Sequence, residues 1–134
     1  MSKFYNEIAE KYDYIFPLSP AHQTFFASEL CGKTVLDVGA ATGNLTAYLL
    51  SQGYEVTAID LSKRLIAEAA KKDIVVQPLN MLDIDQLAIF DNIVCIGNTL
   101  PHLDSKASVQ LFLKKAYGQL TQEGKLVLQL VNFE

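Results

Sequence analysis

The sequence predicts an α/β protein in which a parallel sheet is covered by helices on both faces. From residue 33 onward, short apolar runs alternate with segments whose apolar residues recur at helical spacing. The apolar runs are nearly continuous, as in Ile93-Val94-Cys95-Ile96, which is typical of strands that are buried on both faces. Strands that alternate with helices in this way favour a parallel sheet. At 134 residues, the chain has the length of one domain.

Two helices are predicted before the first strand. Residues 3–14 carry apolar and aromatic side chains at helical spacing, which indicates an amphipathic helix. The segment Phe16-Pro17-Leu18 interrupts this pattern. Ser19 and Pro20 then combine an N-cap residue with a proline at the first helical position, so a second helix is expected from there to about Leu30.

The rest of the chain is predicted to contain five strands joined by helices and loops. The strands are expected at residues 34–38, 55–60, 74–77, 92–97 and 125–132. Helices are expected at residues 43–51, after Ser62 as N-cap, and from Ser105 as N-cap to about residue 120. The buried faces of the last two are expected to hold Leu65, Ile66, Ala69 and Ala70, and Val109, Phe112, Leu113 and Ala116. Residues 80–88 are predicted to form a loop with about one helical turn.

The charge and composition make nucleic acid and anionic membranes poor partners. The net charge is −4, and the 11 lysines and arginines form no basic patch. No apolar run approaches the ~18–20 residues of a membrane span, and the first residues lack the apolar segment of a signal peptide. A cytoplasmic location is therefore expected. Cys31 and Cys95 lie far apart in sequence and are expected to be reduced thiols.

The most informative segment joins the first predicted strand to the helix that follows it. In Asp37-Val38-Gly39-Ala40-Ala41-Thr42-Gly43, an apolar run ends at an acid and continues through small residues. Such a loop allows a ligand to lie directly against the backbone. Asp60 stands at the end of the next strand, an arrangement with which open α/β sheets hold a nucleoside. A dinucleotide fingerprint would need glycines at positions 39, 41 and 44, and only Gly39 is present, which counts against a nicotinamide cofactor.

This loop resembles motif I of the class I S-adenosylmethionine-dependent methyltransferases, whose usual form is (D/E)-x-G-x-G-x-G. Asp37, Gly39 and Gly43 match the motif, Ala40 lies within it, and Ala41 replaces the middle glycine. The resemblance implies that all five residues contact S-adenosylmethionine. An ordinary strand-to-helix turn is the alternative.

Three further segments resemble cofactor-binding parts of the same family. Ala58-Ile59-Asp60-Leu61-Ser62 is similar to motif II, which implies that Asp60 accepts hydrogen bonds from both ribose hydroxyls and that Leu61 lies against the adenine. Asn80 stands where an acid usually accepts the adenine amine, with Asp83 as the rival, and Met81 would pack on the ring. A capping aspartate, a core leucine and a polar loop without ligand are the alternatives.

The last two resemblances concern the end of the site where the methyl group lies. Residues 90–103 resemble motif IV, which implies that Asn98 and Thr99 line that end, with His102 as a weaker candidate. The N-terminal pattern Phe4-Tyr5-x-x-Ile8-Ala9-x-x-Tyr12-Asp13 is similar to the helix that covers the active site of small-molecule methyltransferases. It implies that Tyr12 lies near the sulfonium, because an aromatic ring tolerates a cation. A helix that only packs on the sheet is the alternative.

Taken as a whole, the resemblance implies a Rossmann-like, doubly wound, mostly parallel sheet with the strand order 3-2-1-4-5. It divides a single domain into a helical lid at residues 1–31 and a cofactor-binding core at residues 32–134, with strands six and seven of the family expected to be absent. The implied function is methyl transfer from S-adenosylmethionine to a small-molecule acceptor. A noncatalytic S-adenosylmethionine-binding module and a nicotinamide-dependent reductase are the alternatives. No residue is identified as a catalytic base, and no metal site is expected, because the histidines and cysteines lack ligand spacing.

The last predicted strand, at residues 125–132, carries apolar side chains up to the end of the sequence. If this strand forms the edge of the sheet, its unpaired backbone faces water or a neighbour. Either the chain is part of a longer protein, or this edge pairs with another molecule, as in a homodimer.

Overall fold

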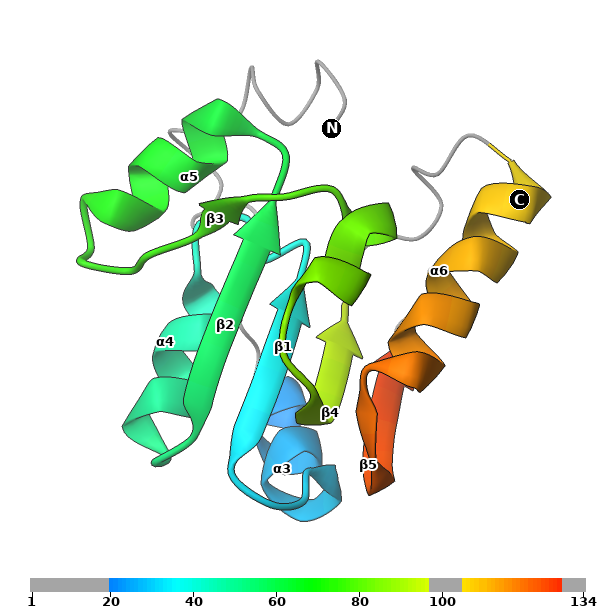
Figure 1. Ribbon diagram of the computed structural model, residues 1–134. Helices are drawn as coiled ribbons and strands as arrows, with labels where there is room; N and C mark the ends of the chain where they lie inside the picture. The colour runs from blue at the N-terminus through cyan, green and yellow to red at the C-terminus, as the bar shows by residue number, and fades with distance from the viewer. Residues whose placement is uncertain (1–19, 97–104, 129–134) are drawn as a thin grey trace, which may run out of the picture.

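The structure, a computed structural model, describes residues 20–96 and 105–128. Five parallel strands form one sheet in the order β3-β2-β1-β4-β5 (Figure 1). The predicted fold class, parallel pairing and strand order are therefore confirmed. The strands are β1 Thr34–Val38, β2 Glu55–Asp60, β3 Gln77–Pro78, β4 Phe90–Cys95 and β5 Leu120–Leu128.

Helices cover both faces of this sheet. They are α3 Pro20–Glu29, α4 Asn44–Ser51, α5 Lys63–Ala70, the 3-10 helix η2 Met81–Gln86 and α6 Lys106–Gly118. Neighbouring residues of β1 point to opposite faces, so Val35 packs with Phe26 of α3 and Leu49 of α4, whereas Leu36 packs with η2 and α6. Both β1 side chains are fully buried, as predicted for doubly covered strands. None of the helices in the described ranges is long and apolar enough to cross a membrane.

Two predicted helix caps are confirmed. The hydroxyl of Ser62 accepts a hydrogen bond from the N–H of Leu65 at 3.3 Å. The hydroxyl of Ser105 accepts one from the N–H of Ser108 at 3.1 Å. Each bond satisfies an N–H group that has no partner within the first helical turn.

The third strand is shorter than predicted. Its apolar pattern predicts a strand at residues 74–77, but only Gln77 and Pro78 pair with β2. Val75, in the middle of the predicted strand, is 80% exposed. The N–H of Ile74 instead donates to the carbonyl oxygen of Ala69 in α5 at 3.1 Å, so pairing with β2 begins only at Gln77. It ends at Pro78, which has no N–H with which to extend the ladder.

Two further expectations need correction. Ala70 is exposed, because successive residues of a helix are rotated by about 100° and Ala69 occupies the buried position. The fifth strand begins earlier than predicted, at Leu120, and its register with β4 is irregular before Lys125. The predicted helix at residues 3–14, the Ser19 cap and residues 129–132 of the last predicted strand lie outside the described residues.

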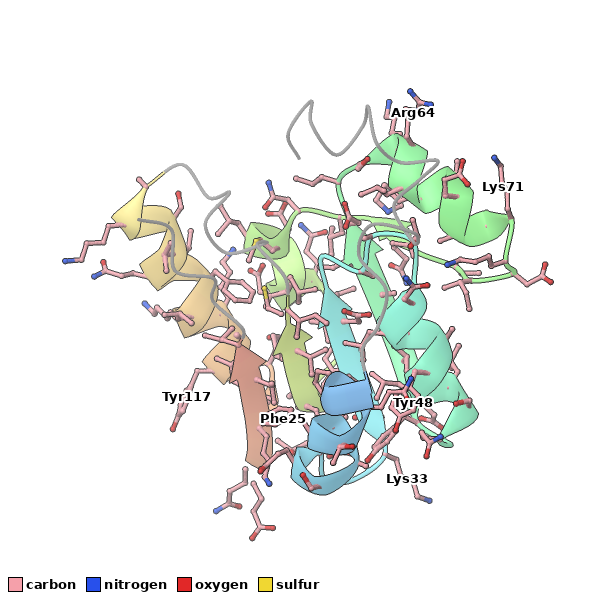
Figure 2. The ribbon with its side chains drawn as sticks, turned by 180° about the vertical axis from the view of Figure 1, so that it is seen from behind. Phe25, Lys33, Tyr48, Arg64, Lys71 and Tyr117 are labelled. Carbon is pink, nitrogen blue, oxygen red and sulfur yellow. The ribbon has the colours of Figure 1, made fainter. Side chains whose placement is uncertain are left out.

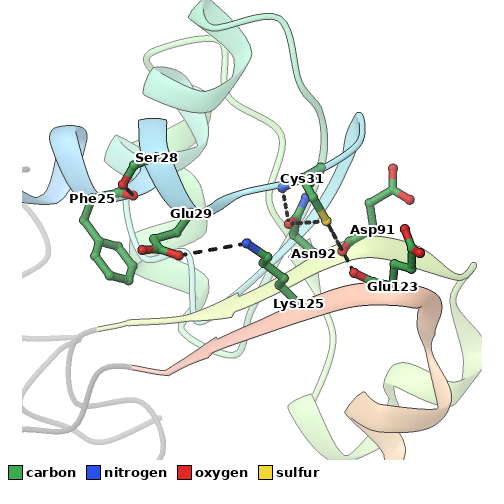
Figure 3. A network of polar contacts seen from close by, with 8 residues as sticks. All are labelled: Phe25, Ser28, Glu29, Cys31, Asp91, Asn92, Glu123 and Lys125. Atoms are coloured by element: carbon green, nitrogen blue, oxygen red, sulfur yellow. Dashed lines mark hydrogen bonds and ion pairs between the residues drawn. The ribbon is translucent and has the colours of Figure 1, made fainter.

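Polar side chains at the start of β4 hold the turn between α3 and β1 (Figure 3). Asn92 is fully buried; its Oδ1 accepts from the N–H of Cys31 at 2.9 Å, and its Nδ2 donates to the carbonyl oxygens of Cys31 and Thr34 at 2.6 and 3.1 Å. Oδ2 of Asp91 accepts from the N–H groups of Lys33 and Thr34 at 2.8 and 3.2 Å, and these bonds hold the pKa of Asp91 below its ordinary value. The network lies at the amino end of β4.

Both cysteines are free thiols, as predicted. Burial, together with the negative charge of Asp37, raises the pKa of the Cys95 thiol to about 12, so this thiol stays protonated at neutral pH.

Candidate cofactor site

The loop between β1 and α4 is a tight backbone turn. The N–H groups of Gly39 and Ala40 both donate to the carbonyl oxygen of Ile59, each at 2.9 Å, and the N–H of Gly43 donates to the carbonyl oxygen of Ala40 at 2.9 Å. Gly39, Ala41 and Gly43 have positive φ angles of 73°, 54° and 85°. These bonds hold the loop against the carboxyl end of β2.

Two positions of this turn show why it consists of small residues. A Cβ atom on Gly43 would lie 2.6 Å from Cγ2 of Ile74, so any side chain there would collide with Ile74. Ala41 adopts the left-handed conformation, which costs a residue with a Cβ about 1–2 kcal/mol. A glycine, which the motif has at this position, would avoid that cost. Ala41 therefore keeps the conformation of the motif while adding strain to it.

The carboxylate of Asp60 joins two loops at the end of β2. Its side chain is 2% exposed; Oδ2 accepts from the N–H of Ala41 at 2.8 Å, and Oδ1 accepts from the N–H of Ser62 at 2.9 Å. Burial raises the pKa of Asp60, and the bonds from Ser62 and Ala41 oppose this rise. A carboxylate has about four lone-pair directions and the N–H groups of Ser62, Ala41 and Leu61 act on this one, so it keeps capacity to accept a further donor.

Asp37 is the most deeply buried acid of the site, with 1% of its surface exposed. Its Oδ2 accepts a hydrogen bond from the hydroxyl of Thr46 at 2.7 Å, whereas Oδ1 has no hydrogen-bond partner among the described residues. Burial raises the pKa of Asp37 to about 7; the bond from Thr46 opposes the rise and the charge of Asp60 adds to it. A buried carboxylate with a vacant acceptor is unfavourable unless a donor or a cation reaches it.

Thr46 is a site residue that the sequence analysis missed. It lies in the first turn of α4 and is 3% exposed. The available signal was a threonine at a buried helix position, nine residues after the acid of the motif. A buried hydroxyl needs a hydrogen-bond partner, and the carboxylate of Asp37 near the end of β1 is that partner.

The residues predicted to face adenine are placed on η2 and after β2. Oδ1 of Asn80 accepts from the N–H of Leu82 at 2.8 Å, so this side chain caps η2. Met81 is buried in the cluster that also contains Ile59 and Leu36. Leu61, directly after Asp60, is 45% exposed. The described structure therefore leaves Leu61 available to a ligand, and it uses Asn80 and Met81 for the local fold.

The remaining predicted residues, Tyr12, Asn98, Thr99 and His102, lie outside the described residues. Within the described ranges, no group of three or more histidine, cysteine, aspartate or glutamate residues could hold a metal ion.

The sequence pattern of the methyltransferase domain matches residues 36–126, which includes the loop, both buried acids and η2. This chain belongs to the methyltransferase domain family. The predicted resemblance to class I S-adenosylmethionine-dependent methyltransferases is thus confirmed at the level of the family.

Two curated relatives and one solved structure illustrate the similarity. The glycine/sarcosine/dimethylglycine N-methyltransferase of Actinopolyspora halophila is 26% identical over 149 residues, and the match covers 100% of this chain and 26% of that protein. The glycine/sarcosine N-methyltransferase of Halorhodospira halochloris is 30% identical over 121 residues, covering 82% of this chain and 45% of that protein. The chain therefore spans less than half of the length of these two relatives.

The solved structure is that of an S-adenosylmethionine-dependent methyltransferase from Clostridium acetobutylicum. It superposes with a TM-score of 0.75 at 21% identity and covers 94% of this chain and 57% of that one. At this identity the likeness supports the fold, and it agrees with the predicted Rossmann-like arrangement.

Proposed function

We propose that this chain binds S-adenosylmethionine at the carboxyl ends of β1 and β2 and takes part in methyl transfer to a small-molecule acceptor. The observation that carries the proposal is the pair of buried carboxylates at these adjacent strand ends, one of them with a vacant oxygen. S-adenosylmethionine offers what they lack: a vicinal diol, an ammonium and a sulfonium. A nicotinamide dinucleotide fits less well, because its anionic pyrophosphate would approach two acids.

Each buried acid receives a distinct role in this proposal. Asp60, held by Ala41 and Ser62, accepts hydrogen bonds from the two ribose hydroxyls. The vacant oxygen of Asp37 faces a positively charged part of the cofactor, which would compensate the buried charge.

The neighbouring residues shape the space around these acids. Gly39, Ala40, Ala41 and Gly43 let the cofactor lie against the backbone, and the exposed Leu61 covers one face of the adenine. Asn80 and Met81 form the wall at the edge of the base, since both lie at the start of η2. Asn98 and Tyr12 are proposed for the methyl end on the strength of the sequence alone.

The protein's contribution to the reaction is alignment and exclusion of water. When bound, S-adenosylmethionine would supply an activated methyl group to a lone pair of the acceptor, with S-adenosylhomocysteine as the leaving group. Correct placement of two reactants contributes roughly 7–11 kcal/mol in favourable cases. A base is required only for an acceptor that arrives protonated, and no described residue is proposed for that role.

The two relatives described above favour a small-molecule acceptor, because they are named as N-methyltransferases of glycine, sarcosine and, in one case, dimethylglycine. The net charge of −4 also disfavours a nucleic-acid substrate. A noncatalytic S-adenosylmethionine-binding module is the second candidate, because the buried acids at the ends of β1 and β2 account for cofactor binding and not for an acceptor.

Calorimetric titration of the chain with S-adenosylhomocysteine and with NAD⁺ tests the proposal. We expect binding of S-adenosylhomocysteine and none of NAD⁺; no binding of S-adenosylhomocysteine would refute the site. Incubation with S-adenosylmethionine and a panel of small amines and amino acids, followed by mass spectrometry, then separates the two candidates. Methylated product supports the enzyme, and binding without product supports the module.

A further inference from the structure

Helix α6 and its C-cap residue Gln119 hold η2 and the two residues after it through two side chains, four positions apart in sequence. The Nζ atom of Lys115 donates to the carbonyl oxygen of Leu82 at 2.6 Å and lies 3.0 Å from Oδ1 of Asp85. The Nε2 atom of Gln119 donates to the carbonyl oxygens of Leu87 and Ala88, each at 2.9 Å. Lys115 therefore binds η2 itself, and Gln119 binds the two residues that follow it.

The hydrogen bonds within η2 hold its backbone only weakly. A 3-10 helix has poorer hydrogen-bond geometry than an α-helix and is stable only in short pieces. Asp83 interrupts η2 with a non-helical backbone, φ −112° and ψ 17°. The ammonium of Lys115 binds the carbonyl of the residue just before this kink, and hydrogen bonds from a charged donor are about twice as strong as neutral ones.

A continuous chain of contacts leads from Lys115 to the predicted base-reading side chain. Lys115 binds the carbonyl oxygen of Leu82, and the N–H of the same residue binds Oδ1 of Asn80 at 2.8 Å. The orientation of the Asn80 amide is thus coupled to the ammonium on α6. Lys115 itself is only 25% exposed at its side chain, so this contact is sheltered from water.

We propose that Lys115 is a positioning residue that fixes the Asn80 amide and so sets the preference of the site for an adenine base over a base without the exocyclic amine. This inference rests on the proposed function and adds to it the element that determines the base specificity. Gln119 supports the two residues that follow η2.

The test compares two nucleosides that differ only at the edge of the base. Dissociation constants of the full chain are measured by calorimetry for S-adenosylhomocysteine and for S-inosylhomocysteine, which has an oxygen in place of the amine. The variant is Lys115→Met, which removes the ammonium at nearly equal length. The matched control is Lys114→Met, because Lys114 is exposed and makes no hydrogen bond or ion pair with the described residues.

We expect wild type and Lys114→Met to share the same preference for the adenosyl compound. In Lys115→Met, the ratio of the two dissociation constants should fall about five- to tenfold, which is the effect of one misplaced hydrogen bond. The fall should come from weaker binding of S-adenosylhomocysteine, with the binding of S-inosylhomocysteine nearly unchanged. In an Asn80→Ala background, Lys115→Met should leave the preference unchanged, because the residue through which it acts is gone. A general loss of stability would instead weaken the binding of both ligands equally, and it would do so in the Asn80→Ala background as well.

The inference is overturned if folded Lys115→Met keeps the wild-type preference, or if wild type binds both compounds equally. Where Lys115→Met does not unfold cooperatively, Lys115→Gln replaces it, with the same expected loss and the same overturning result. A wild-type chain that binds neither compound refutes the proposed function instead, so the two failures are distinguishable.

Discussion

The hydroxyl of Thr46 binds one oxygen of Asp37 at 2.7 Å and leaves the other oxygen without a partner in the described structure. Through this bond α4 fixes the orientation of the Asp37 carboxylate near the end of β1, but it provides a hydrogen bond to only one of the two oxygens. The result is a carboxylate whose charge is unfavourable in the empty protein and becomes favourable when a cation arrives. This arrangement connects the stability of the free chain with its affinity for a ligand.

The free protein should therefore become more stable when Asp37 is changed to asparagine. The folded pKa of about 7 lies above the ordinary value of 3.8, so the carboxyl stabilises the fold below about pH 4, and this contribution is lost as the pH rises to about 7. The shift of about three units corresponds to at most about 4 kcal/mol. Urea unfolding without ligand should show Asp37→Asn to be more stable than wild type at pH 8, with a difference that shrinks towards pH 4.

Glu55→Gln is the control for this experiment, because Glu55 is an exposed carboxylate at the start of β2. Its stability should follow that of wild type across the range. The same Asp37→Asn protein should bind S-adenosylhomocysteine more weakly than wild type does. If the free energy of unfolding depended on pH equally in wild type and Asp37→Asn, burial of the charged Asp37 carboxylate would not cost stability as inferred.

Removal of the Asp60 carboxylate should weaken cofactor binding. Asp60→Ala leaves ribose hydroxyls without acceptors and frees the buried N–H groups of Ala41 and Ser62, so we expect affinity for S-adenosylhomocysteine to fall by roughly 1–3 kcal/mol. Calorimetry gives the affinity, and thermal unfolding of the same samples shows whether the protein remains folded. Asp60→Asn keeps one acceptor oxygen, so its affinity for S-adenosylhomocysteine should lie between those of wild type and Asp60→Ala. Unchanged affinity in folded Asp60→Ala would remove the ribose assignment.

Replacement of Ala41 by glycine should stabilise the protein. The φ of 54° costs alanine about 1–2 kcal/mol, and glycine loses about 0.5–1 kcal/mol more backbone entropy on folding. The net gain is therefore up to about 1.5 kcal/mol in urea unfolding, with cofactor affinity at least as high as in wild type. Ala47→Gly, at an exposed interior position of α4, is the matched control and should instead destabilise by about 0.5–1 kcal/mol. A loss of stability in both variants would show that the turn is not strained.

The parts of the fold that were predicted correctly have local signals. The bounds of β1 and β2 follow from apolar runs between polar residues, and Ser62 and Ser105 begin helices because their hydroxyls cap the first turn. Asp37 and Asp60 could be brought to one edge of the sheet from sequence alone, because parallel strands end at the same edge.

The parts that were missed depend on contacts across the fold. The predicted strand order already places β3 at the edge of the sheet, but the apolar pattern of residues 74–77 does not show that only Gln77 and Pro78 pair with β2. The bond between Thr46 and Asp37 depends on how α4 lies against β1, and Asn92 binds residues about 60 positions earlier in the chain. Such side-chain contacts leave no periodic pattern in the sequence.

The Asn92 network should be essential for stability and irrelevant to the cofactor. Asn92→Ala removes the hydrogen bonds that a fully buried side chain makes to the N–H and the carbonyl oxygen of Cys31, so we expect a loss of about 2–3 kcal/mol in urea unfolding. Gln110→Ala, at an exposed position of α6, is the control and should change stability by less than about 0.5 kcal/mol. Because the network lies at the opposite end of the sheet from Asp60, folded Asn92→Ala should bind S-adenosylhomocysteine like wild type. A large loss of affinity at full folding would contradict this separation.

The outer edge of β5 should pair with a second copy of the chain. In the described sheet, β5 has a neighbour only on the β4 side, and the unpaired backbone of an edge strand is a template for association. Tyr117, which is 82% exposed, projects from α6 on the side where β5 ends the sheet (Figure 2). Sedimentation velocity should show a dimer that dissociates on dilution. Tyr117→Lys should weaken it, because a charge beside an edge strand opposes pairing. Val75→Lys, an equally exposed position near the opposite edge strand β3, should leave the dimer intact. A monomer at every concentration, or equal weakening by both variants, would exclude this edge as the interface.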